Sequence, residues 1–124
     1  MEENLVHVMV ALVIARRGRV LLLAGPDQLM FPNTELRQRE GWQSASARCA
    51  QDLLKMQVWA EPMPIGECII SDGGREALAV LIRCEVDTED IPPGIPASWH
   101  PTSTPPDPFH EQHLPIWEIV ARTQ

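Results

Sequence analysis

The sequence predicts an α/β fold in a single domain that spans residues 1–124. Its length suits one domain, because a chain of this size buries roughly two thirds of its extended surface on folding. It is 44% hydrophobic and 22% charged, which allows a real core. Several apolar stretches of strand character surround one segment with a strong preference for helix, and this order of segments is what favours the α/β class.

The first strands are predicted from apolar patterning. Residues 5–15 form a near-continuous apolar stretch rich in Val and Ile, which is typical of a strand covered on both faces. Residues 16–19 interrupt it with three arginines and a glycine, and the apolar character resumes at 20–23, which predicts a hairpin. Turn signals follow at Gly25-Pro26-Asp27 and at Pro32-Asn33.

A helix is predicted from Trp42 to Met56, because this segment holds no Gly or Pro and is dominated by good helix formers. Its apolar side chains cover an unusually wide arc of the helix surface. They form two neighbouring stripes, the first of Trp42, Ala45, Cys49, Leu53 and Met56 and the second of Ala47, Ala50 and Leu54.

A second hairpin is predicted where residues 65–71 and 76–86 flank the sequence Asp72-Gly73-Gly74-Arg75. A two-residue loop at Gly73-Gly74 places Cys68 opposite Ala79, so Cys68 cannot meet Cys84. The three cysteines, at 49, 68 and 84, are an odd number and contain no Cys-x-x-Cys pair. They therefore fit reduced thiols better than a disulfide framework or a zinc site.

The last third of the chain is predicted to be mostly loop. Seven of the 12 prolines lie between residues 91 and 109, which predicts a Pro-rich loop there. Residues 114–121 are apolar again and are expected to supply a final strand or one short helical turn.

The charge distribution bears on partners and location. The net charge of −7 lies entirely in residues 63–124, since residues 1–62 hold equal numbers of acidic and basic side chains. An acidic chain argues against a nucleic-acid partner. The longest apolar run, residues 8–15, is far too short to span a bilayer, and Glu2 and Glu3 oppose a secretory signal. We therefore expect a cytoplasmic protein with no membrane partner.

One set of residues resembles a known signature. Phe31-Pro32-Asn33-Thr34, followed by Glu40 and then Arg48, resembles the Nudix hydrolase family, whose motif is G-x5-E-x7-R-E-U-x-E-E-x-G-U with U aliphatic. Laid on this chain, the motif covers residues 34–56 without gaps. The resemblance implies a Nudix-like α/β/α sandwich with a mixed sheet. It also implies a second helix that is shortened or absent, because only seven residues follow Trp117.

The motif is degenerate at the positions that matter for chemistry. Glu40 and Arg48 match, and they are expected to form the ion pair that ties loop to helix in the family, with Pro32 as a further scaffold residue. The glutamate after the arginine is Cys49, and the paired glutamates are Asp52 and Leu53. The first and second motif glycines are Thr34 and Lys55.

The lost carboxylates weaken the metal site that the resemblance implies. In the family the three helix carboxylates share one helix face, where they gather oxygen ligands for Mg²⁺ or Mn²⁺. Here only Asp52 remains, and Asp52 with Glu40 makes a weak metal site at best. Cys49 is a poor ligand for a hard cation and Leu53 is none.

Two functional hypotheses follow from the resemblance. The first is a Nudix-like protein impaired in Mg²⁺-dependent diphosphate hydrolysis and retained for ligand binding or dimerisation. The alternative is an active hydrolase that cleaves a nucleoside diphosphate linked to another moiety. Its catalytic and metal-binding residues would be Glu40 and Asp52, with Glu67 or Glu76 completing the site.

Ligand and subunit contacts are predicted from two further groups of side chains. Arg37, Arg39 and Arg48 are suited to a phosphate or carboxylate of a nucleotide or another small molecule, or are solvated surface charges. The apolar stripe of Trp42, Cys49, Leu53 and Met56 predicts an apolar pocket or a homodimer interface, with plain core packing as the other interpretation.

Overall fold

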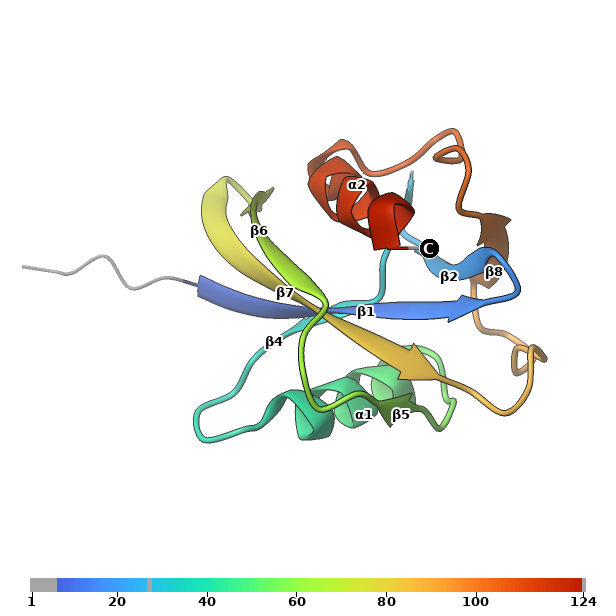
Figure 1. Cartoon of the computed structure of the whole chain (residues 1–124), viewed down its shortest axis with the longest axis horizontal. Coiled ribbons are helices and arrows are strands. Elements are labelled where there is room, and N and C mark those ends of the chain that lie inside the picture. The colour runs from blue at the N-terminus through green and yellow to red at the C-terminus, as the bar shows by residue number, and fades with distance from the viewer. Residues whose placement is uncertain (1–6, 27, 124) are drawn as a thin grey trace, which may run out of the picture.

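The computed structural model describes residues 7–26 and 28–123. Two long strands, β1 and β7, cross at the centre, with α1 on one side of the sheet and α2 on the other (Figure 1). The elements in chain order are β1 (His7–Arg16), β2 (Arg19–Ala24), β3 (Leu29–Met30), β4 (Asn33–Glu35), α1 (Trp42–Leu53), β5 (Trp59–Ala60), β6 (Gly66–Asp72), β7 (Arg75–Glu85), β8 (Ala97–Pro101), a 3₁₀ turn (Glu111–His113) and α2 (Leu114–Thr123).

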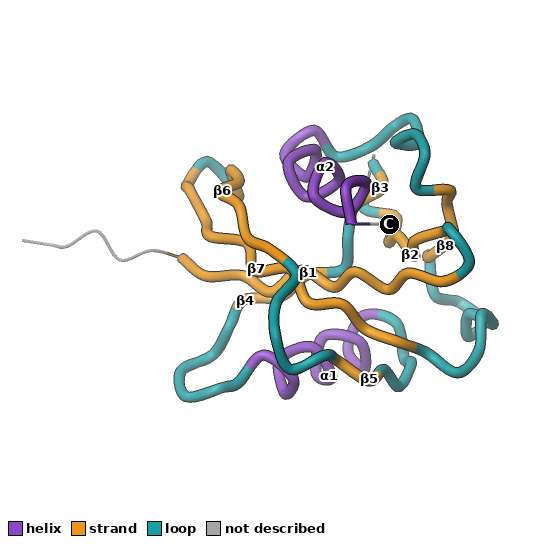
Figure 2. Tube along the Cα trace, viewed as in Figure 1, coloured by secondary structure: helices purple, strands orange, loops and turns teal. Residues whose placement is uncertain are grey.

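The sheet is mixed, as predicted. β1 and β7 pair in parallel from His7 opposite Ala77 to Ile14 opposite Cys84. The other pairings are antiparallel: β1 with β2 and β4, β2 with β3 and β8, and β7 with β5 and β6 (Figure 2). The α/β class and the sandwich architecture expected from the sequence are therefore confirmed.

Side chains of β1 alternate between two cores, because successive residues of a strand point to opposite faces. Ala11 and Val13 join the core under α2, together with Trp117. Leu12 and Ile14 join the core under α1. Both faces of β1 are thus covered, which explains its near-continuous apolar sequence. The predicted start of this strand, Leu5 and Val6, lies outside the described residues, as do Glu2 and Glu3.

Both predicted hairpins form. The β1–β2 loop is Arg17-Gly18 and the β6–β7 loop is Gly73-Gly74, and all four residues have positive φ. Such two-residue loops match the twist of the strands they join. Cys68 lies opposite Ala79, as predicted, and the three cysteines are free.

The Pro-rich segment differs from the prediction. Residues 91–109 were expected to be a loop, but residues 97–101 form β8, which pairs along β2 from Leu23 to Arg19. The prolines do not prevent this, because within the described part of the chain β8 is an edge strand that pairs with β2, and Pro101 is its last residue. The turn at Gly25-Pro26 is present, with the Gly25 N–H donating to the Gln28 carbonyl, while Asp27 lies outside the described residues.

The second helix is present, so the expectation of a strand or one short turn at the end of the chain was wrong. α2 has ten residues and places Ile116, Trp117 and Val120 in the core. Pro115 lies at its second residue, where the first turn of a helix tolerates a missing N–H. In the described part of the chain, no helix is long and apolar enough to cross a membrane.

Candidate functional site

The predicted Glu40–Arg48 pair forms and is bidentate. Arg48 Nε donates to Glu40 Oε2 at 2.9 Å, and Arg48 Nη2 donates to Glu40 Oε1 at 2.8 Å. The two side chains are 13% and 18% exposed for Glu40 and Arg48, respectively. Planar guanidinium and carboxylate groups fit each other in this arrangement, which makes it stronger than a single hydrogen bond.

Arg48 also holds β4 against α1. Its Nη1 donates to Thr34 Oγ1 at 3.1 Å, and its Nη2 donates to the Glu35 carbonyl at 2.9 Å. Glu40 Oε1 in turn accepts the Arg37 N–H at 3.0 Å. The pair therefore joins three parts of the motif, namely the strand, the loop of residues 36–41 and the helix. Thr34 stands at a glycine position of the motif, so the sequence did not predict that its hydroxyl accepts a hydrogen bond from Arg48.

The hydrogen bonds between Glu40 and Arg48 keep both side chains charged. The hydrogen bond from Arg48 lowers the pKa of Glu40 from 4.5 to about 2, with burial opposing the shift. The same hydrogen bond raises the pKa of Arg48. Both Glu40 oxygens are engaged by Arg48, so the carboxylate is held as a structural anion, and its proposed part in binding metal stays a prediction.

Pro32 lies in the segment that leads into β4. Its carbonyl accepts the Leu12 N–H at 2.9 Å, and Asn33 Nδ2 donates to the Phe31 carbonyl at 2.9 Å. The first bond attaches the start of the motif to the central strand, and the second lies within the segment itself. Pro32 is thus placed as a scaffold residue, next to the buried Phe31.

The three motif positions that carry glutamates in the family differ widely in exposure. Cys49 is 1% exposed, and burial raises the pKa of its thiol to about 12, so it is neutral near pH 7. Leu53 is half-buried against the α1 core. Only Asp52 is exposed to solvent.

The apolar stripe on α1 is divided between the core and its margin, so two of its four residues fit the interpretation as plain core packing. Cys49 and Met56 belong to the core between α1 and the sheet, while Trp42 and Leu53 pack at its margin. The wide apolar arc is used by a helix that lies flat on the sheet. Dimerisation through this stripe stays a prediction that rests on Trp42 and Leu53 alone.

The donor set does not fit the divalent metal that the resemblance implies. Among residues 7–26 and 28–123, no group of three or more His, Cys, Asp or Glu side chains is placed to hold a metal ion. Glu67 and Glu76, the expected additional ligands, are exposed on the β6–β7 hairpin and join no such group. Mg²⁺ prefers several oxygen ligands, and Asp52 supplies only one side chain.

Arg37 and Arg39, the predicted ligand-binding residues, are both exposed on the loop that the Glu40–Arg48 pair supports. Arg39 has a φ of 64°. Their binding role stays a prediction.

The chain turns away from α1 at Lys55, the residue that stands at the second motif glycine. Lys55, at the second motif glycine, has a φ of 56°, in the left-handed region that favours glycine. Just after it, the Met56 N–H donates back to the Ala50 carbonyl at 3.4 Å. The helix therefore ends in a left-handed residue, a conformation that glycine usually supplies at this place.

Comparison of the whole structure with solved structures identifies the fold. A NUDIX family hydrolase from Clostridium perfringens superposes with a TM-score of 0.76 at 12% identity, covering 95% of this chain and 98% of that one. The fold is that of the Nudix hydrolases. A MutT protein from Methanosarcina mazei gives 0.78 at 14% identity, covering 99% and 98% of the two chains.

A third Nudix structure agrees. The MutT NUDIX hydrolase from Burkholderia pseudomallei gives a TM-score of 0.75 at 18% identity, covering 94% of this chain and 99% of that one. No family model and no curated protein matches the sequence. The Nudix fold is thus evident from the structure, although sequence identity to these solved structures is only 12–18%.

Proposed function

We propose that this Nudix-fold protein is impaired in metal-dependent diphosphate hydrolysis and is retained to bind a small anionic ligand such as a nucleotide. The observation that carries the proposal is the burial of Cys49 at a carboxylate position of the motif. A neutral thiol inside the core supplies no oxygen ligand to Mg²⁺ or Mn²⁺.

The chemistry of hydrolysis explains why this loss matters. A divalent ion assists attack on a diphosphate by neutralising its charge and by activating water, and both effects need an ion held in a fixed position. Asp52 alone, exposed on the helix surface, offers one flexible carboxylate. No hydrolytic step can be assigned to the residues that this chain places around it.

The preserved parts of the motif support a binding role. The Glu40–Arg48 pair still fixes the loop of residues 36–41, and that loop presents Arg37 and Arg39 to solvent. Guanidinium groups on a fixed loop suit a phosphate or carboxylate. A scaffold that holds anion-binding side chains does not require the metal ligands.

Turnover assays test the loss of hydrolysis. The protein is incubated with Mg²⁺ or Mn²⁺ and a panel of nucleoside diphosphate derivatives, and released phosphate and nucleoside monophosphate are measured. We expect no release above the protein-free rate. Clear turnover that disappears in Asp52→Ala, and survives in the matched surface variant Asp87→Ala, would refute the proposal. Loss of that turnover in Glu67→Gln or Glu76→Gln would favour the alternative hydrolase.

Binding is tested separately by NMR titration with a nucleoside diphosphate, with and without Mg²⁺. We expect saturable shifts on the loop of residues 36–41 that do not depend on the metal. Arg37→Gln/Arg39→Gln should weaken them, whereas Arg75→Gln/Arg122→Gln, which removes the same charge elsewhere on the surface, should not. Equal weakening by both double variants would show that only net charge matters and would contradict a site on this loop.

A further inference from the structure

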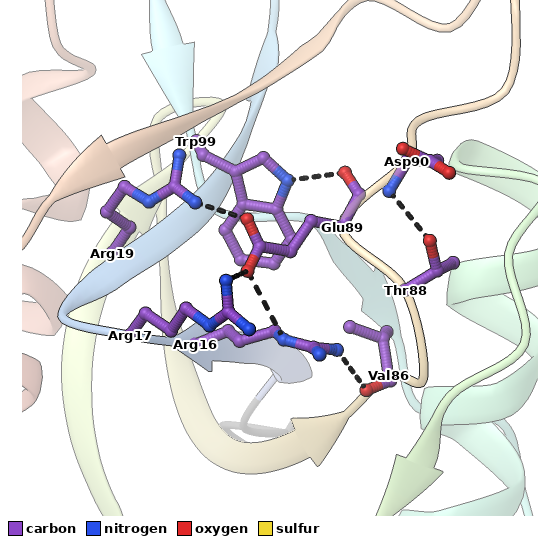
Figure 3. A network of polar contacts seen from close by, with 8 residues as sticks. All are labelled: Arg16, Arg17, Arg19, Val86, Thr88, Glu89, Asp90 and Trp99. Carbon is purple, nitrogen blue, oxygen red and sulfur yellow. Dashed lines mark hydrogen bonds and ion pairs between the residues drawn. The ribbon is translucent and has the colours of Figure 1, made fainter.

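Three arginines of the β1–β2 hairpin converge on one carboxylate. Glu89, in the segment after β7, accepts a hydrogen bond from Arg19 through Oε1. Its Oε2 lies 3.3 Å from Arg16 Nε and 3.5 Å from Arg17 Nη1 (Figure 3). We call Arg16, Arg17 and Arg19 the arginine cluster. None of its residues belongs to the motif segment 34–56.

The cluster holds more positive charge than Glu89 neutralises. Three guanidinium groups face one carboxylate, which leaves two positive charges in excess. Asp87 and Asp90 of the same segment are exposed, and Figure 3 shows the Asp90 carboxylate on the side of the segment away from the arginines. Like charges held this close repel one another, and a further anion beside them would reduce that repulsion.

Fastening the segment after β7 does not require all three arginines. Arg19 supplies the hydrogen bond to Glu89, and Arg16 Nη1 donates to the Val86 carbonyl at 3.0 Å. Among the described residues, Arg17 contacts Glu89 only as an ion pair at 3.5 Å, and its side chain is 74% exposed. The hydrogen bonds from Arg16 and Arg19 therefore hold the segment after β7 in place without Arg17.

Arg17 is also an unusual residue for its place in the turn. Its φ is 54°, in a two-residue loop where Asn, Asp or Gly is preferred. A long cationic side chain is held here in a backbone conformation that costs about 1 kcal/mol for a residue with a Cβ. Strain of this kind is characteristic of functional positions.

Trp99 gives the cluster a rigid base. The Arg19 guanidinium lies 5.7 Å from the centre of the Trp99 ring, and the ring Nε1–H donates to the Glu89 carbonyl at 2.9 Å. Stacking on an aromatic face fixes the plane of a guanidinium and keeps its remaining N–H groups available. Arg19 and Glu89 are therefore both positioned by one side chain of β8.

We propose that the arginine cluster is a binding site for a dianionic phosphate group, as inorganic phosphate or a phosphomonoester. Such a group carries a charge of about −1.5 to −2 near pH 7, which matches the two positive charges left in excess. It binds on the solvent side of Arg17, with Glu89 remaining as an internal anion that holds the arginines together. This site is separate from the proposed ligand site near Arg37.

The test uses ¹H–¹⁵N NMR of the full chain at constant ionic strength, titrated with inorganic phosphate and with glycerol 3-phosphate. The reporters are the Arg Nε–H signals and the indole N–H of Trp99. We expect saturable shifts of the Arg16, Arg19 and Trp99 signals. Comparable binding of both probes identifies a site for the phosphate group alone, and tighter binding of glycerol 3-phosphate identifies a phosphomonoester site.

Variants locate the binding. Arg17→Gln should lower the affinity for phosphate at least tenfold. Arg75→Gln, which removes one charge beside the β6–β7 turn, should leave that affinity unchanged. Glu89→Gln keeps a side-chain oxygen that can accept the hydrogen bond from Arg19 but removes an anion close to the phosphate, so it should strengthen binding roughly tenfold. The proposal is overturned by shifts that do not saturate, by equal weakening in Arg17→Gln and Arg75→Gln, or by an unchanged affinity in Glu89→Gln.

Discussion

Replacing Glu40 with glutamine removes one charge of the Glu40–Arg48 pair while keeping the shape of the side chain. The variant therefore imitates the protonated carboxyl group. The pKa of Glu40 falls from 4.5 to about 2 in the folded protein, mainly because of the hydrogen bond from Arg48. At about 1.4 kcal/mol for each pKa unit, this difference corresponds to about 3 kcal/mol of folding stability.

The sign of the pH dependence follows from the direction of the shift. A carboxyl group whose pKa is lowered by folding stabilises the folded state while it is ionised in both states, above about pH 4.5. Its contribution is lost as the pH falls from 4.5 towards 2. We therefore expect the free energy of unfolding of the wild type to exceed that of Glu40→Gln by about 3 kcal/mol at pH 7 and by much less near pH 2.

Urea unfolding of both proteins between pH 7 and pH 2 measures this difference directly. Glu118→Gln, an exposed glutamate on α2, is the matched control and should stay within about 0.5 kcal/mol of wild type throughout. A difference for Glu40→Gln below about 1 kcal/mol at pH 7, the value of an ordinary surface pair, would refute the reasoning. A large difference that does not shrink on acidification would refute it as well.

Two further predictions concern the end of α1 and the thiols. Lys55→Gly should raise the free energy of unfolding by about 1 kcal/mol, because glycine adopts the φ of 56° without strain. The midpoint of thermal unfolding should then rise by about 4 °C. A lower midpoint would contradict the backbone conformation assigned to Lys55. Burial raises the pKa values of Cys49 and Cys84 to about 12 and also raises that of Cys68, but only Cys68 is partly exposed. Cys49 and Cys84 should therefore resist iodoacetamide at pH 8 while Cys68 reacts slowly, so mass spectrometry should find one modified thiol in the native protein and three in urea.

Local signals in the sequence predicted the elements whose conformation is decided locally. The Gly73-Gly74 loop set the register of β6 and β7, including Cys68 opposite Ala79. The Glu40–Arg48 pair was expected only through the family resemblance. A separation of eight residues does not by itself predict a contact, because the two side chains meet only when the loop folds back on the helix.

Elements that depend on distant partners were not predictable in this way. β8 lies in a Pro-rich segment, and it is a strand because β2 supplies the hydrogen bonds for it. The contact between Arg16 and Glu89 joins residues whose numbers differ by more than seventy, so no pattern in the sequence marks it. α2 was underestimated because only seven residues follow Trp117, whereas the helix begins before that residue, at Leu114, and tolerates Pro115 in its first turn.

The changes in the motif divide according to what each residue does for the fold. Glu40 and Arg48 are kept, and they attach β4 and its loop to α1. Lys55 stands at a glycine position of the motif and has a φ of 56°, which is in the region that favours glycine. Cys49 has become part of the core, where an ionised carboxylate would be costly to bury without a partner. Because this packing favours an uncharged side chain at position 49, it stabilises the scaffold, and under the proposed function it also disfavours an oxygen ligand there.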